Sequence, residues 1–74
     1  MREIKTPEDF RDAIEEARTG ARMSQRTVAH LSGAAHGSYW LWQRINPGNV
    51  TLHNALAYAK TVGLKLFVKK DTEK

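Results

Sequence analysis

The sequence predicts a mainly α protein with four short helices and one strand at the C-terminal end. Apolar residues gather on one face of each of four segments, and residues suited to begin or end a helix flank those segments. The segment 64–70 instead alternates apolar and polar residues, which is typical of a strand. Because 74 residues are enough for one small core, we expect a single domain over 1–74.

The first helix is predicted to follow Thr6, which can cap it, with Pro7 at the first position, where a missing N–H is harmless. Gly20 is expected to end this helix. Its apolar residues recur at helical spacing, which predicts one buried stripe. They are Phe10, Ala13, Ile14 and Ala17.

Two further helices separated by a tight turn are predicted over 24–43. Ser24 is a good N-cap, and Gly33 suits the left-handed conformation that commonly ends a helix. Tyr39 and Trp42 lie three residues apart on one face of the second helix of this pair. Together these features predict a helix-turn-helix.

The pattern Gln25-x-x-x-Ala29-x-x-x-Gly33, followed by Tyr39 and Trp42, resembles the Cro/repressor-type (XRE) helix-turn-helix family of DNA-binding proteins. This resemblance implies a four-helix Cro/repressor-like domain that lays its third helix into the major groove of DNA.

The resemblance extends from about Phe10 to about Leu66 and includes departures from the family pattern. Gln43 stands where an acidic residue is common, and Val50 stands where a proline is frequent.

A fourth helix is predicted after a loop over 44–49 that is rich in Asn, Pro and Gly. Thr51 would cap this helix and Gly63 would close it. Its expected apolar face consists of Leu52, Ala55, Leu56, Ala59 and Val62.

The C-terminal strand needs a partner, because an unpaired strand leaves a row of open N–H and C=O groups. The segment around Ile4 can supply one within the chain, and a second copy can supply one across a dimer. We favour a homodimer, as the resemblance to small repressors and antitoxins implies; a strand folded onto its own domain is the alternative. The expected dimer interface consists of Leu64, Leu66, Phe67 and Val68.

Charge is distributed unevenly along the chain, whose net charge is +4. Residues 1–16 carry three basic and six acidic side chains, whereas residues 17–70 carry eight basic side chains and no acidic one. Such a surface favours a polyanion as partner, so we expect double-stranded DNA. Chance is the alternative explanation, since small basic domains are common.

The resemblance assigns the base-contacting positions to the third helix and the turn before it. His36 would donate a hydrogen bond from either ring nitrogen to a guanine acceptor, and Trp40 and Leu41 would press on thymine methyl groups. The alternatives are that His36 is merely solvated and that Trp40 packs in the core in place of Trp42. The expected base-reading residues are Ala35, His36, Gly37, Ser38, Trp40 and Leu41.

Phosphate contacts are expected from polar and basic residues around the start of the second helix and the end of the third. Each basic side chain can equally be a solvated surface residue, and Arg18 is a weaker candidate. The expected phosphate-contacting residues are Arg22, Gln25, Arg26, Thr27, Arg44, Asn46 and Asn49.

Other chemistries have little support. The chain has no cysteine, and His30, His36 and His53 lack the spacing of a metal site, so we expect no metal and no cofactor. No carboxylate lies near a serine in the order that hydrolysis requires, so we expect no enzyme. No apolar span and no signal peptide are evident, which favours the cytoplasm.

The sequence therefore predicts a homodimeric, sequence-specific DNA-binding transcriptional regulator, most simply a repressor. One alternative is the antitoxin of a toxin–antitoxin module, whose acidic segment 8–16 would face a basic protein partner. Another is a protein-interaction module that does not bind DNA, with Trp40 and Leu41 exposed as an apolar patch.

Overall fold

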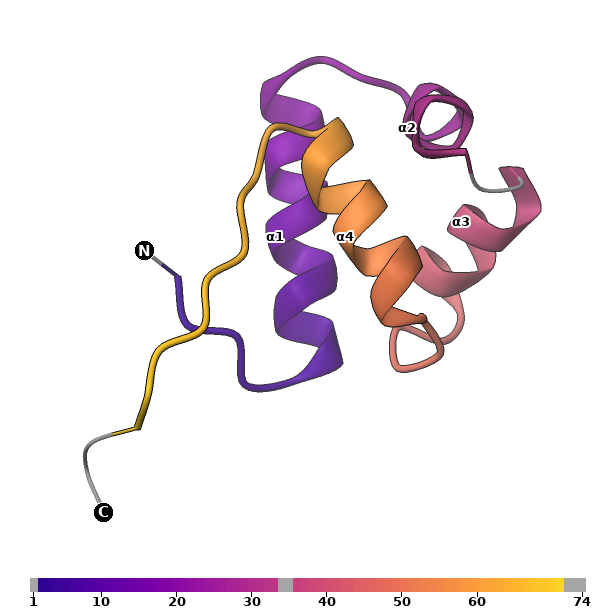
Figure 1. Cartoon of the computed structure of the whole chain (residues 1–74). Helices are drawn as coiled ribbons and strands as arrows, with labels where there is room; N and C mark the ends of the chain where they lie inside the picture. Colours follow the sequence, from indigo (N-terminus) through magenta and orange to yellow (C-terminus); the bar gives the residue numbers. More distant parts are fainter. Residues whose placement is uncertain (1, 34–35, 72–74) are drawn as a thin grey trace.

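The computed structural model describes residues 2–33 and 36–71 of the chain, and these residues form four helices (Figure 1). The predicted number and order of the helices are confirmed. Their bounds are α1 Pro7–Gly20, α2 Gln25–Ser32, α3 His36–Arg44 and α4 Leu52–Thr61.

α1 begins with the cap that the sequence predicts. The Asp9 N–H donates to Thr6 Oγ1 at 3.1 Å, and the Thr6 N–H donates back to Asp9 Oδ2 at 3.1 Å. This reciprocal pair satisfies two backbone donors that the first turn leaves without a helical partner. Pro7 occupies the first turn, as expected.

α1 ends at Gly20, but the left-handed residue that follows is Arg22 and not a glycine. Arg22 has φ 59°, a conformation that costs free energy for a residue with a Cβ atom. The Met23 N–H donates to the Arg18 carbonyl at 3.0 Å and so closes the last turn of the helix. The chain thereby turns sharply from α1 toward α2.

α2 and α4 have the predicted ends. Ser24 accepts from the Thr27 N–H, and Thr51 accepts from the Asn54 N–H, each as an N-cap. Gly33 follows α2 with φ 83°, and Gly63 follows α4 with φ 84°. Because only glycine adopts this conformation without a steric cost, both positions explain why the helices end there.

Four aromatic rings form the centre of the core. Trp42 of α3 lies 5.9 Å from Phe10 of α1, 5.5 Å from Tyr39 and 5.0 Å from Tyr58 of α4, measured between ring centroids. The Trp42 Nε1–H donates to the Pro47 carbonyl at 2.8 Å, which attaches the following loop to α3. Paired aromatic rings stabilise the fold beyond the apolar area that they bury.

The predicted apolar face of α4 is partly wrong. Ala55, Ala59 and Val62 are buried, but Leu52 and Leu56 are 73% and 47% exposed, while Tyr58 is 1% exposed. The stripe that faces inward is chosen by contact with the aromatic rings of α1 and α3, and Tyr58 reaches them. Hydrophobicity alone favoured the leucines, which lie beside that stripe.

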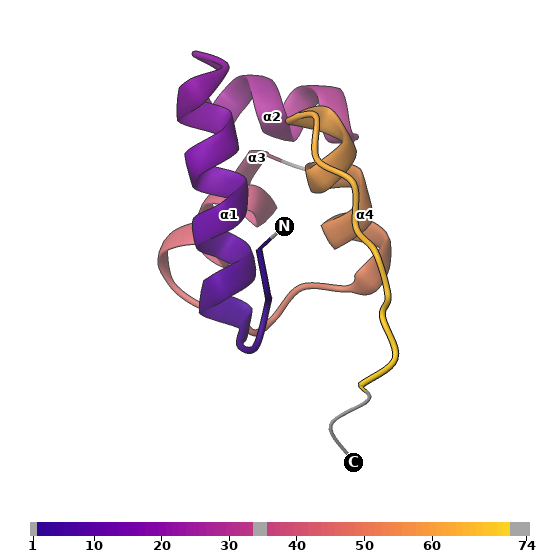
Figure 2. The same ribbon diagram turned by 90° about the vertical axis from the view of Figure 1, so that its left-hand side faces the viewer.

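The predicted C-terminal strand is absent from the part of the chain that the structure describes. Residues after Gly63 are extended without strand pairing, and Phe67 and Val68 are exposed. The segment around Ile4 does not pair with them either: the two terminal segments cross in Figure 1 but are well separated in Figure 2. Alternation places side chains on opposite faces, but only a partner can supply a ladder of backbone hydrogen bonds.

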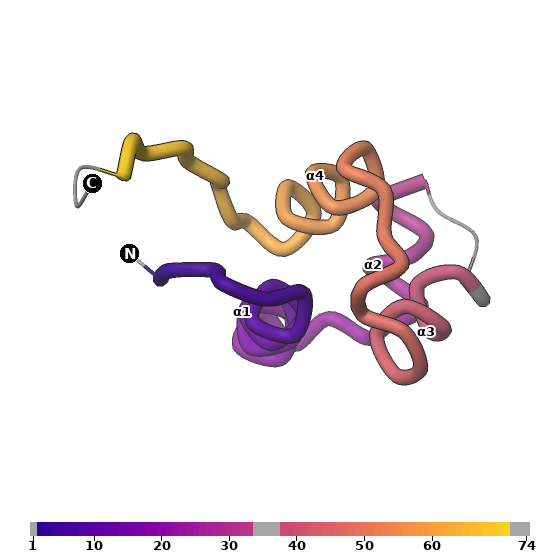
Figure 3. The backbone as a smooth tube through the Cα atoms, turned by 90° about the horizontal axis from the view of Figure 1, so that it is seen from below, coloured from indigo at the N-terminus to yellow at the C-terminus, as the bar shows by residue number. Residues whose placement is uncertain are grey.

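Both terminal segments leave the molecule on the same side, opposite α2 and α3 (Figure 3). In Figure 1, α2 is seen nearly end-on, so it crosses α1 and α4 at a steep angle. The α2–α3 pair is therefore accessible on a face of the molecule that the termini do not approach.

Candidate nucleic-acid interface

α3 separates its side chains into a buried face and an exposed face. Tyr39 and Trp42 are 0% and 3% exposed, whereas Trp40 and Leu41 are 41% and 54% exposed. Ser38 is also exposed. The alternative in which Trp40 replaces Trp42 in the core is wrong. The two rings face apart because residues two positions apart in a helix point about 200° from one another.

Three of the expected base-reading positions lie at the start of α3 or before it. Ala35 lies outside the described residues. For His36 and Gly37 the structure gives the helical backbone but not the surroundings of the side chains. The described part of the expected base-reading set is therefore Ser38, Trp40 and Leu41, all of which are exposed.

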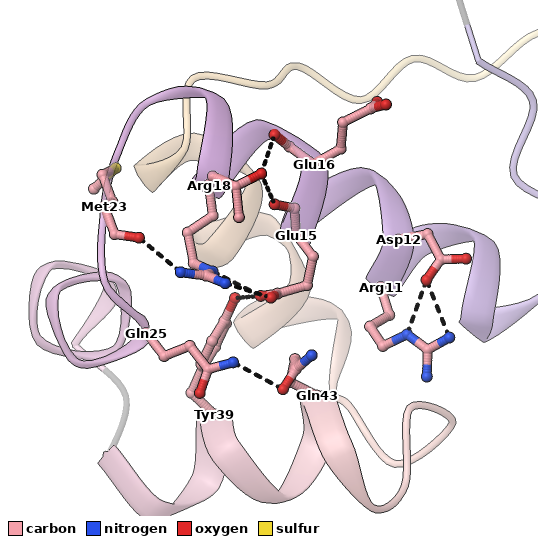
Figure 4. A network of polar contacts seen from close by, with 10 residues as sticks. Arg11, Asp12, Glu15, Glu16, Arg18, Met23, Gln25, Tyr39 and Gln43 are labelled. Carbon is pink, nitrogen blue, oxygen red and sulfur yellow. Dashed lines mark hydrogen bonds and ion pairs between the residues drawn. The ribbon is translucent and has the colours of Figure 1, made fainter.

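A hydrogen bond joins the start of α2 to the end of α3. Gln25 Nε2 donates to Gln43 Oε1 at 2.9 Å, and the pair is partly buried (Figure 4). The side chain of Gln25 thus has a partner within the protein, and its contact with phosphate stays a prediction. The bond brings together the two helix ends from which Arg26 and Arg44 project into solvent.

The basic residues expected at the phosphates are exposed. Arg22, Arg26 and Arg44 are all exposed to solvent. The Arg44 guanidinium lies 5.9 Å from the centre of the Trp40 ring. This contact between a cation and an aromatic face holds two exposed side chains of α3 together. Thr27 is also exposed, and its hydroxyl lies 2.9 Å from the Ser24 hydroxyl.

The loop after α3 shares a surface with the exposed face of that helix. A shallow depression of about 330 Å³ lies between α3 and α4. Ser38 and Leu41 line it from α3, and Asn46 and Asn49 line it from the loop. Four of the residues expected at the DNA thus lie around one depression.

Arg18, the weaker phosphate candidate, is held inside the protein. Its Nε and Nη2 donate to the Glu15 carboxylate at 3.0 and 2.7 Å, and its Nη1 donates to the Met23 carbonyl at 2.8 Å (Figure 4). The Tyr39 hydroxyl donates to the same carboxylate at 2.7 Å. Glu15, Arg18 and Tyr39 together form a polar cluster.

The polar cluster is not among the sites that the sequence predicts. The spacing of Glu15 and Arg18, three residues apart on α1, indicates an ion pair and was the available signal. Nothing local indicates Tyr39, which lies 24 positions after Glu15.

The ionisation of the polar cluster follows from its contacts. Burial by itself raises the pKa of Glu15, but hydrogen bonds from Arg18, Tyr39 and Gln25 stabilise the carboxylate and bring that pKa below its ordinary value. Burial and the hydrogen bond to Glu15 raise the pKa of the Tyr39 hydroxyl. Near neutral pH the cluster therefore holds a carboxylate, a guanidinium and a neutral phenol.

Two further features bear on other chemistries. Within residues 2–33 and 36–71, no group of three or more His, Asp and Glu side chains is arranged to hold a metal ion. In the same residues, no helix has the length and apolar character that crossing a membrane requires.

The arrangement of α2 and α3, with a left-handed Gly33 at the end of α2, defines the helix-turn-helix class of folds. The protein matches the HipB chain of the solved structure described as "Structure of HipA-HipB-O2-O3 complex" with a TM-score of 0.84. The two chains share 20% sequence identity over 99% of this protein and 100% of that chain. At 20% identity, this similarity shows that the two chains share a fold.

Comparison with protein-family models gives no match, and comparison with curated proteins gives none either.

Proposed function

We propose that this protein is a cytoplasmic, sequence-specific regulator that binds double-stranded DNA, most simply a repressor of the XRE type. One observation carries the proposal. The exposed face of α3 lies next to Arg44, and the Gln25–Gln43 bond sets the start of α2, with Arg26, beside the end of α3. A continuous basic and apolar surface of this kind suits the major groove and its phosphates.

Affinity comes mainly from the phosphate backbone in this mechanism. Arg22, Arg26 and Arg44 release counterions from DNA as they bind, and Thr27, Asn46 and Asn49 add neutral hydrogen bonds. The absence of acidic residues between positions 17 and 70 removes repulsion from this surface.

Sequence preference comes from α3. Trp40 and Leu41 contact thymine methyl groups, while Ser38 and His36 provide hydrogen bonds to base edges. Because no Arg or Asn stands among these residues, DNA shape and deformability add to the preference.

A homodimer would place two copies of α3 on two half-sites. The exposed Leu66, Phe67 and Val68 support this part of the proposal, because pairing with a second copy would cover them and give the extended segment the partner that a strand needs. Sedimentation velocity tests it: the wild type should sediment as a dimer, and Phe67→Ser should shift the protein toward monomer. A wild type that is monomeric at every accessible concentration contradicts the dimer.

The DNA-binding proposal is tested by selecting bound sequences from a random pool and then measuring mobility shifts. Wild type should bind the selected duplex more tightly than a random one, and its affinity should fall steeply with salt. Arg26→Ala and Arg44→Ala should weaken binding to both duplexes alike. Lys5→Ala is the matched control, because it removes one exposed positive charge from the N-terminal segment, which lies on the opposite side of the molecule from α2 and α3 (Figure 3).

A second candidate function is antitoxin activity, favoured by the fold match to a chain solved in complex with HipA. The acidic side of α1, which includes Glu8, Asp12 and Glu16, would face a basic protein partner. Co-expression with the product of the adjacent gene, followed by size-exclusion chromatography, tests this function. If no duplex binds but a stable complex forms, the protein is an interaction module that does not bind DNA.

We also propose that the protein is a binding protein and not an enzyme. The partly buried carboxylate of Glu15 is engaged by Arg18 and Tyr39, and Asp9 is engaged by the cap of α1. Both groups thus have structural partners that occupy their acceptor oxygens.

A further inference from the structure

The polar cluster lies behind the exposed face of α3 and joins three parts of the chain. Glu15 and Arg18 belong to α1, Tyr39 belongs to α3, and the Met23 carbonyl belongs to the connection just before the Ser24 cap of α2.

The ion pair between Glu15 and Arg18 holds the side chains of the polar cluster in place. Glu15 and Arg18 form a two-pronged ion pair with side chains only 19% and 16% exposed. Because the pair is bidentate and partly shielded from water, its geometry is better defined than that of an exposed ion pair. The carboxylate that accepts from Tyr39 is therefore itself held in place.

Tyr39 connects this fixed carboxylate to α3. Its ring is fully buried and meets the Tyr58 ring edge-on, with centroids 4.8 Å apart and an interplanar angle of 85°. Ring packing sets how deeply α3 lies in the core, but apolar contacts tolerate small rotations of the helix. The hydroxyl bond adds a directional restraint against such rotation.

The restraint acts on the exposed residues because a helix rotates as a unit. At about 6 Å from the helix axis, a rotation of about 10° moves an atom by about 1 Å. Such a movement would stretch the 2.7 Å bond from Tyr39 to Glu15 beyond hydrogen-bonding distance, and it would displace Trp40 and Leu41 by a similar amount. Recognition residues need placement within about 0.5 Å.

We infer that the Tyr39–Glu15–Arg18 cluster positions α3 for base recognition, with Tyr39 as the positioning residue. It contacts no base and no phosphate in this role. The inference rests on the proposed DNA-binding function. It adds to that function a buried residue, Tyr39, on which the discrimination between DNA sequences depends.

The test compares Tyr39→Phe with Tyr58→Phe. Each variant loses one phenolic oxygen from a buried ring of the same aromatic cluster, but of these two hydroxyls only that of Tyr39 donates to Glu15. Affinities for the selected duplex and for a random duplex are measured at one salt concentration and at a temperature where circular dichroism shows both variants folded.

Tyr39→Phe should reduce the ratio of selected to random affinity by about tenfold, the discrimination that one well-placed base contact provides. Its random-duplex affinity and its salt dependence should match those of the wild type, because the phosphate contacts remain. Tyr58→Phe should leave the ratio unchanged. If Tyr39→Phe keeps the wild-type ratio, the inference is wrong even when the variant is less stable.

A measurement without DNA separates this inference from the proposed function. Under native conditions, Tyr39→Phe should speed amide hydrogen exchange in α3 about tenfold more than Tyr58→Phe does, as expected for loss of a charge-assisted bond. If the wild type binds no duplex, the proposed function fails, and equal exchange in the two variants would show that the positioning role fails too.

Discussion

The two tryptophans of α3 provide the sharpest test of the fold, because the same substitution at each should have opposite consequences. Trp42 is 3% exposed and donates to the Pro47 carbonyl, whereas Trp40 is 41% exposed and contacts Arg44. We therefore compare Trp42→Phe with Trp40→Phe.

The cost of Trp42→Phe follows from its surroundings. A phenyl ring buries about 50 Å² less surface than an indole ring, which corresponds to about 1.3 kcal/mol. Loss of the bond to Pro47 adds about 1 kcal/mol, and the space left among Phe10, Tyr39 and Tyr58 adds a further fraction. The free energy of unfolding should fall by about 2–3 kcal/mol in total.

Trp40→Phe should change the free energy of unfolding by less than about 0.5 kcal/mol, since Trp40 is 41% exposed, a phenyl ring keeps part of its contacts, and the contact with Arg44 is in water. Urea denaturation followed by far-UV circular dichroism measures both values. With a slope of about 1 kcal/mol per molar urea, the midpoint of Trp42→Phe should fall by about 2–3 M.

The base preference of DNA binding should change in Trp40→Phe, the variant that keeps its stability, and not in Trp42→Phe. Trp40→Phe should alter which bases are preferred, and Trp42→Phe should keep the wild-type preference under conditions where it is folded. Equal losses of stability in the two variants, or an altered preference in Trp42→Phe alone, would refute the assignment of Trp42 to the core and Trp40 to the recognition surface.

Three further predictions concern the backbone and the polar cluster. Arg22→Gly should raise the free energy of unfolding by about 1 kcal/mol, because the φ of 59° at this position suits glycine. The same variant should bind all duplexes more weakly, because it loses a positive charge. Arg22→Lys keeps the charge and should show no gain of stability in urea denaturation. Gly33→Ala should cost about 1 kcal/mol, since its φ is 83° and an added Cβ meets nothing within 4 Å; a loss above about 3 kcal/mol would show a clash instead. Acid should also destabilise the fold. Arg18 and Tyr39 lower the pKa of Glu15 from 4.5, so the unfolded chain binds the proton more tightly, and this contribution to stability is present above pH 4.5 and lost as pH falls through the folded pKa. Urea midpoints across this range should fall less steeply in Glu15→Gln.

The exposed residues of the candidate site could be predicted from the sequence, but the hydrogen bonds that hold its helices in place could not. Spacing on α3 and the resemblance to a known family were enough to propose Ser38, Trp40 and Leu41 as exposed residues. The bond from Gln25 to Gln43 spans 18 positions, and the bond from Tyr39 to Glu15 spans 24, so no local pattern indicates either. These bonds hold the helices in the arrangement that the surface requires.

The sequence alone determined where the helices begin and end, because caps and left-handed glycines act within a few residues: Thr6, Ser24, Thr51, Gly33 and Gly63 all occupy their predicted roles. The tertiary structure alone decided which face of α4 is buried, what Gln25 and Arg18 bind, and whether residues 64–70 form a strand. Each of these depends on groups that the chain brings together from distant positions. A helix satisfies its own backbone hydrogen bonds, whereas a strand, a buried face and an ion pair are completed only by a partner.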